Sequence, residues 1–107
     1  MADLIGVSTL NGAAVDGLTV RQTRLMAFKA FNAGAAGFVQ VFDTLASVST
    51  GTVPRFVWQA PASQAIEPTW PAGYAQTFAS GIRFELSSVA SVYASHPAQM
   101  FINVMAV

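Results

Sequence analysis

Turn-forming residues occur at short, regular intervals along this chain, and their spacing limits the folds that the chain can adopt. Asn-Gly and Asp-Gly pairs favour the tight turns of β-hairpins. Segments rich in Gly, Ser, Thr or Pro separate the apolar stretches that follow. The turn signals are Asn11-Gly12, Asp16-Gly17, 32–37, 47–54, 60–73, Ser80-Gly81 and His96-Pro97. Frequent turns between short apolar segments are typical of an all-β sandwich or barrel.

The segments between the turns have the composition of β-strands, because aromatic and β-branched residues dominate them. The predicted strands are 24–31, 37–43, 55–59, 74–79, 81–86 and 100–107. Only 81–86 alternates cleanly between apolar and polar residues, which predicts a strand with one solvent-exposed face. We therefore predict an all-β fold, a small antiparallel β-sandwich or jelly-roll-like arrangement of about seven strands.

A chain of 107 residues has room for one hydrophobic core. We expect a single β-sandwich domain over 1–107, in which 1–16 form a less packed N-terminal arm. Two helical alternatives stay open, one over 19–33 and one short helix over 87–94. Lys and Glu, the usual residues on the solvent side of a helix, number only one and two. A strand is therefore the favoured interpretation of 24–31.

The chain carries very little charge. Charged residues make up 9% of it and hydrophobic residues 53%, whereas charged residues average about 25% of a globular domain. The five basic and five acidic residues cancel. Such a surface resists association poorly, so we expect neighbouring subunits or partners to cover much of it. The balance also argues against disorder and against nucleic-acid binding, which needs an excess of Lys and Arg.

The longest uncharged segment, 86–107, is long enough to span a bilayer but contains many polar residues. Serines, a histidine, a glutamine and an asparagine interrupt it, which indicates strands and turns in contact with water. We therefore expect no association with a membrane.

The sequence lacks the residue patterns of catalytic and metal sites. It contains no cysteine, which excludes disulfides, thiolate nucleophiles and Cys-based zinc sites. Its one histidine, His96, precedes a proline and is expected in a turn. Asp43 and Glu67, or Glu67 and Glu85, could in principle pair as a glycosidase dyad, but solvation or ion pairing is their expected role. With no phosphate-binding loop either, we predict no enzymatic activity, no cofactor and no metal.

A small basic cluster raises the alternative of single-stranded nucleic acid. It consists of Arg21, Arg24 and Lys29, interleaved with Phe28 and Phe31. The two phenylalanines would lie on opposite faces of an extended strand, so they cannot form one stacking platform for bases. We therefore expect no nucleic-acid partner.

Several predicted strands are apolar on both faces, although a sandwich strand needs only one apolar face. The second face would leave an exposed apolar patch, which monomers rarely tolerate. We predict that these faces contact other subunits, together with the segment 60–73, whose prolines preorganise it. The predicted interface residues are Phe56, Trp58, Trp70, Phe101, Asn103 and Met105. Exposed tryptophans beside amides and carboxylates would instead suit a carbohydrate- or peptide-binding β-module, which stays the alternative.

Particular residues also carry a resemblance to a known group of proteins. Phe31-Asn32 precedes a turn of small residues and the strand 38–43. The chain continues with Gly51-Thr52-Val53-Pro54 and Phe56, and Gly81-Ile82 opens a strand that ends at Leu86-Ser87-Ser88. In composition and order, residues 24–107 resemble the small β-sandwich structural proteins of tailed-bacteriophage virions, of the capsid decoration, cement or head-fibre type.

The resemblance implies a protein that stabilises or decorates the virion and has no active site. It implies a location in the virion, after assembly in the cytoplasm of the bacterial host. The implied partners are the major capsid protein or another virion protein, and copies of the chain itself, with trimers suited to an icosahedral shell. A tail or head-tail structural protein, or a carbohydrate- or receptor-binding module of a phage appendage, is the alternative.

Overall fold

The computed structural model describes residues 3–11, 18–21, 23–69, 76–96 and 99–106. These residues form strands and connecting loops, and they contain no helix that could cross a membrane. The strands are β1 (Asp3–Asn11), β2 (Leu18–Val20), β3 (Arg24–Asn32), β4 (Gly37–Phe42), β5 (Phe56–Ala60), β6 (Gln64–Ile66), β7 (Gln76–Thr77), β8 (Ile82–Ser87) and β9 (Gln99–Ala106).

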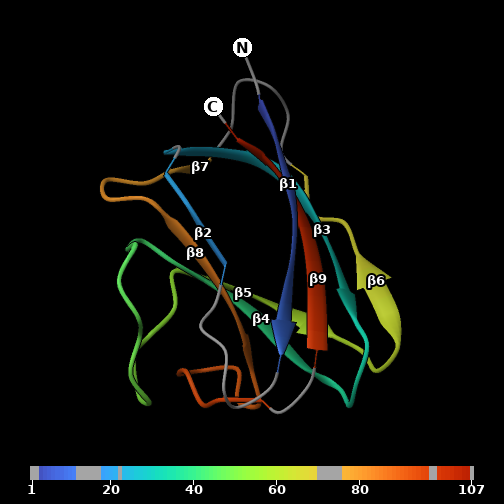
Figure 1. Ribbon diagram of the computed structural model, residues 1–107. Coiled ribbons are helices and arrows are strands. Elements are labelled where there is room, and N and C mark those ends of the chain that lie inside the picture. The colour runs from blue at the N-terminus through green and yellow to red at the C-terminus, as the bar shows by residue number, and fades with distance from the viewer. Residues whose placement is uncertain (1–2, 12–17, 22, 70–75, 97–98, 107) are drawn as a thin grey trace.

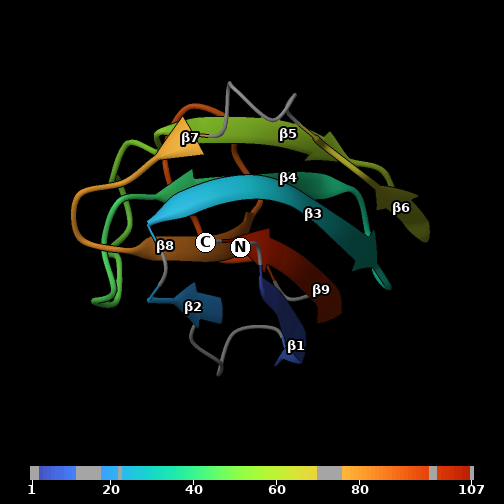
Figure 2. The ribbon, with the colours of Figure 1, turned by 90° about the horizontal axis from the view of Figure 1, so that it is seen from above.

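The strands form two antiparallel sheets that face each other (Figures 1 and 2). The first sheet has the order β1-β9-β3-β6, and β7 also pairs with β3. The second sheet has the order β2-β8-β4-β5. These findings confirm the predicted all-β antiparallel sandwich. Six strands rather than seven form its frame among the described residues, three in each sheet, because β2, β6 and β7 are only two or three residues long.

The pairing of the strands is nested in the manner of a jelly roll. β1 pairs with β9, β2 with β8, β3 with β6, and β4 with β5. Within this scheme the chain crosses from one sheet to the other at each connection except the one from β4 to β5, and β7 is an addition on β3. This is the two-sheet jelly-roll topology. It places the first and last described residues side by side, because Asp3 of β1 pairs with Ala106 of β9 (Figure 1).

The core lies between the two sheets and is apolar. Phe28 of the first sheet packs edge-on against Trp58 and Phe84 of the second, at 5.0 Å between ring centroids in both cases. Edge-to-face contacts of this kind stabilise a core beyond the area that they bury. The buried core residues are Leu25, Phe28, Ala30, Val39, Val41, Ala60, Phe78, Ile82, Phe84, Leu86, Ile102, Val104 and Ala106.

The predicted strands 24–31, 37–43, 55–59, 81–86 and 100–107 correspond to β3, β4, β5, β8 and β9. Of the predicted strand 74–79, only Gln76–Thr77 forms a strand, β7, and residues 74–75 lie outside the described part of the chain. Both helical alternatives are wrong where the structure describes them. β3 takes up most of the first segment, and 87–94 is an irregular loop that begins at the end of β8.

Part of the expected N-terminal arm is a strand, while its looser packing stays a prediction. Asp3–Asn11 is strand β1, which pairs with β9 along its length, while 12–16 lie outside the described residues. This strand could not be recognised from alternation of apolar and polar residues, because its register with β9 shifts between Ile5 and Ser8. Such an irregularity breaks the period of two by which a strand is recognised.

Candidate functional site

Strand β5 carries two of the predicted interface residues, Phe56 and Trp58. Both are half-buried and pack against the core. Val57, between them, is 42% exposed, so the outer side of β5 is that of Val57 rather than that of its aromatic neighbours. Contact between a partner and the exposed parts of Phe56 and Trp58 stays a prediction.

The other predicted interface residues lie in β9 or beyond the described residues. β9 runs between β1 and β3, and its register pairs Phe101 with Phe31, Asn103 with Lys29 and Met105 with Ala27. The side chains of Phe101, Asn103 and Met105, and the whole of Trp70, lie outside the described part of the structure.

Phe31 is an exposed aromatic residue that the interface prediction did not include. It lies on β3, it is 39% exposed, and it pairs with Ala65 of β6, which is also exposed. The signal was present in the sequence, because Phe31 falls on the strand face opposite Phe28. The described part of the first sheet therefore offers an aromatic contact point at its outer surface.

Strand β8 is buried on both faces, so the predicted solvent-exposed face of 81–86 is wrong. Ile82, Phe84 and Leu86 enter the core, whereas Arg83 and Glu85 point to the other side of the sheet. Arg83 Nε donates a hydrogen bond to Glu85 Oε2 at 2.5 Å, and both side chains are more than nine-tenths buried. This ion pair takes two of the ten charges of the chain away from the surface.

Two loops meet over this outer side of the second sheet. Gln40, which is fully buried beside Glu85 in the sheet register, donates from Nε2 to the carbonyls of Val89, Ala90 and Val92 at 2.8 to 3.2 Å. The 88–95 loop is thus fixed to β4 by a buried amide.

The 43–55 loop is fixed in turn to the 88–95 loop through the backbone of Tyr93. The N–H of Tyr93 donates to the carbonyl of Thr52 at 2.8 Å, and its carbonyl accepts from the N–H of Gly51 at 2.9 Å. The two loops are therefore joined to each other and, through Gln40, to β4.

A second polar anchor holds the turn between the β7 and β8 strands. Asp43 Oδ1 and Oδ2 accept hydrogen bonds from the N–H groups of Ser80 and Ala79, at 2.8 and 3.0 Å. These two N–H groups hold the pKa of Asp43 below its usual value of 3.8, because they stabilise the charged carboxylate. The N–H of Ala79 has the larger effect. Arg55 donates from Nη1 to the carbonyl of Thr77 on the same crossover.

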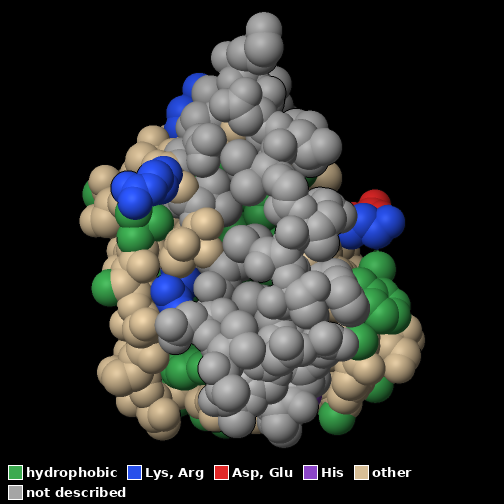
Figure 3. Space-filling view, viewed as in Figure 1, with side chains coloured by type: hydrophobic (Ala, Val, Ile, Leu, Met, Phe, Trp, Pro, Cys, Tyr) green, Lys and Arg blue, Asp and Glu red, His purple; other side chains and the backbone are tan. Residues whose placement is uncertain are grey.

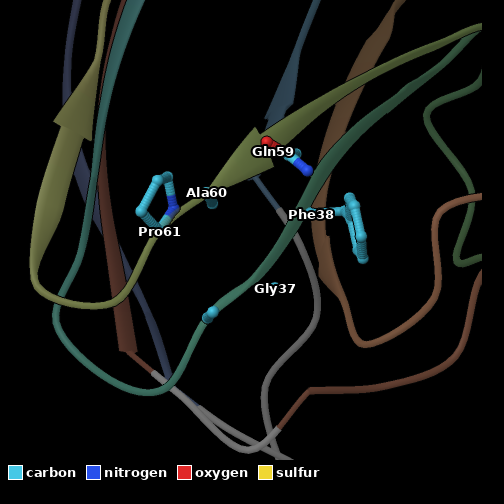
Figure 4. Close-up of a pocket in the computed structure, with 6 residues that line it drawn as sticks. Gly37, Phe38, Gln59, Ala60 and Pro61 are labelled. Carbon is cyan, nitrogen blue, oxygen red and sulfur yellow. The ribbon is translucent and has the colours of Figure 1, made fainter.

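One end of the sandwich contains a small pocket of about 250 Å³ (Figure 4). Gln59 and Phe38 lie on adjacent strands there, and Pro61 follows the end of β5. The lining residues are Ala36, Gly37, Phe38, Gln59, Ala60 and Pro61, a set with one amide and no charged side chain. Such a lining offers apolar contact and hydrogen bonds but no acid or base.

Two polar side chains close the same end of the molecule. Asn32 donates from Nδ2 to the carbonyls of Ala35 and Ala60, which ties β3 to the end of β5. His96 lies in a loop as predicted but is buried, with Nε2 2.9 Å from the carbonyl oxygen of Ala36. Its Nδ1 has no hydrogen-bond partner among the described residues. His96 is therefore held against the 34–37 turn by this hydrogen bond.

The carboxylates named as a hypothetical dyad lie in three separate interactions. Asp43 holds the β7–β8 crossover, Glu85 pairs with Arg83, and Glu67 lies 3.2 Å from Lys29 in an exposed ion pair. Within the described ranges, no three His, Cys, Asp or Glu side chains gather in a group that could hold a metal ion. The absence of catalytic activity, cofactor and metal stays a prediction.

Figure 3 shows the face that carries β1, β9 and β3. On its coloured part, Lys, Arg, Asp and Glu side chains appear at separated points among hydrophobic and uncharged atoms.

A comparison with protein-family models and with curated proteins finds no match to the chain.

Replacing Gln40 by leucine should release the 88–95 loop. The substitution removes the amide donor that three carbonyls share, and Ser87 Oγ still donates to those of Val89 and Val92. The carbonyl of Ala90 loses its donor, and a buried unpaired polar group costs about 1–3 kcal/mol. We expect a loss of stability of that size in urea denaturation and faster hydrogen exchange at Tyr93 and Ala94. Gln59→Leu, at an exposed site on the next strand, is the matched control. Equal effects of the two substitutions would contradict the role of Gln40.

The ionised Asp43 should stabilise the folded chain at neutral pH. The pKa of Asp43 in the folded state is below 3.8, its usual value in an unfolded chain. Between these two pKa values the unfolded state binds more protons, so the free energy of unfolding rises with pH across that window. The stabilisation is therefore lost as the pH falls through the folded-state pKa. Asp43→Asn should show a weaker dependence in urea denaturation at a series of pH values, whereas Glu67→Gln should keep it. Parallel curves for wild type and Asp43→Asn would refute this assignment.

Proposed function

We propose that the chain is a structural protein of a virion, which decorates or cements a phage capsid by associating with copies of itself and with the shell. The observation that carries this proposal is the shortage of charge on the surface. With Arg83 and Glu85 buried as a pair, at most eight charges remain for an accessible surface of 5422 Å². A surface with so few charges favours association over dispersal.

Exposed hydrophobic side chains support the same proposal. Phe31, Val53, Val57 and Val89 are between 39% and 72% exposed. Single exposed apolar residues are ordinary on a protein surface. An aromatic residue such as Phe31, however, is of the kind that anchors interfaces. The outer surface of the first sheet around Phe31 is therefore the proposed contact with another subunit or the shell.

The topology adds support by analogy. Jelly rolls with this strand order serve as virus capsid domains, and also as lectin and cupin domains. A fold shared by several functions does not assign one of them. The combination of this topology with a charge-poor surface favours a shell component over a metal-binding cupin, which would need clustered ligands.

Introducing a charge at Phe31 should weaken binding to the shell. We expect purified wild-type chain to co-sediment with phage shells that lack it, and Phe31→Glu to bind more than about tenfold more weakly, because anchor residues contribute about 2 kcal/mol or more. Thr50→Glu, at an exposed site in the 43–55 loop, controls for the added charge. Circular dichroism checks that the variants remain folded.

Trp70→Ala provides a separate test of the predicted contact through 60–73. Retained binding in this variant would remove that segment from the interface. Binding to tails rather than shells would support the alternative of a tail or head-tail protein. A wild-type chain that binds neither structure would contradict the proposed function.

A further inference from the structure

A second pocket, of about 330 Å³, lies on the second sheet, where the chain leaves β4 and returns to β5. It is separate from Phe31, which belongs to the first sheet. Unlike the pocket of Figure 4, this one combines charged groups, hydroxyls and an apolar wall. Its lining consists of Phe42, Asp43, Thr44, Val48, Thr52, Val53, Pro54 and Arg55.

The Asp43 carboxylate is held in place on this wall and keeps acceptor capacity. Its oxygens accept hydrogen bonds from the backbone N–H groups of Ser80 and Ala79, and the N–H of Gly81 also acts on the carboxylate. An ionised carboxylate has about four acceptor positions, so one remains for a further hydrogen bond. Asp43 is also exposed to solvent, which leaves that position open to a ligand. A fixed carboxylate of this kind can accept a hydrogen bond from a hydroxyl group of a ligand.

Arg55 supplies the opposite charge on the same pocket and is likewise fixed. Its guanidinium donates to the carbonyl of Thr77 and lies 4.5 Å from the centroid of the Phe78 ring. Guanidinium groups carry five N–H donors in a rigid plane. The contact with Thr77 uses Nη1 alone, so further donors remain for the oxygen atoms of a ligand.

The remaining walls are also ordered by the protein itself. Thr52 donates from Oγ1 to the carbonyl of Ser49 at 2.8 Å, and Thr44 Oγ1 accepts from the N–H of Ala46 at 3.0 Å. Leu45 packs against Gly81, where any side chain would overlap it. Groups fixed before a ligand arrives lower the entropy lost on binding. Val53, 72% exposed, adds an apolar surface at the pocket.

We propose that this pocket binds a neutral saccharide. One carboxylate and one guanidinium balance in charge, which disfavours a simple anion or cation. Together with two hydroxyl side chains, they offer acceptors and donors to several hydroxyl groups at once, and Val53 and Pro54 offer an apolar surface to the C–H groups of a sugar ring. The proposal does not depend on the assembly function, because Phe31 is not part of the pocket.

The test is a chemical-shift titration of the ¹⁵N-labelled full chain with the methyl glycosides of glucose, galactose, mannose and N-acetylglucosamine. We expect at least one of them to give saturable shifts at the amides of Thr44, Thr52 and Arg55, with a Kd in the millimolar range. Glycine and inorganic phosphate are the comparison ligands. Tighter binding of either one than of every glycoside would overturn the saccharide assignment.

Two variants locate the binding. Asp43→Asn should raise the Kd by about tenfold or more, because it removes a charge-assisted hydrogen bond. Val53→Arg changes an exposed residue of the wall, so the fold should tolerate the substitution. The new guanidinium can form an ion pair with the Asp43 carboxylate and so block the pocket. Val89→Arg, at another exposed valine outside this pocket, should bind as wild type does. Absence of saturable shifts with all four glycosides, or equal binding in wild type and Val53→Arg, would overturn the proposal.

Discussion

Burial of β4 and β8, the two adjacent strands of the second sheet, on both of their faces is the constraint on which the rest of this structure depends. Their outer side carries Arg83, Glu85 and Gln40, and buried charges and amides need hydrogen-bonding partners. The 88–95 loop supplies three carbonyls to Gln40, and the 43–55 loop is joined to it through Tyr93. Two long irregular segments in so small a domain are thus explained by the polar layer that they cover.

The same arrangement determines what the surface offers to other molecules. Pairing Arg83 with Glu85 inside the protein leaves at most eight charges for the rest of the molecule. The first sheet presents Phe31, the proposed contact between subunits, while the 43–55 loop, held by its contacts with Tyr93, forms the pocket of Asp43 and Arg55. The proposed assembly surface and the proposed ligand site therefore lie on different sheets of the jelly roll.

Local sequence patterns were sufficient to predict the central strands but not their environment. Turn residues and aromatic segments located β3, β4, β5, β8 and β9 closely. Alternation suggested an exposed face for β8, yet Arg83 and Glu85 are buried there as an ion pair. β1 was not predicted, because a register shift interrupts the alternation of its side chains between the two faces of the strand. At the candidate site, period-two alternation could have identified Phe31, whereas the contacts of Asp43 with Ala79 and Ser80 span more than 30 residues and depend on the fold.

Sedimentation velocity of the purified chain over the micromolar range tests most directly whether this surface is built for association. The account predicts a discrete oligomer that becomes dominant as concentration rises, with a mass that is a small multiple of 11.2 kDa. A single 11.2 kDa species at every concentration, with no binding to phage shells, would contradict it.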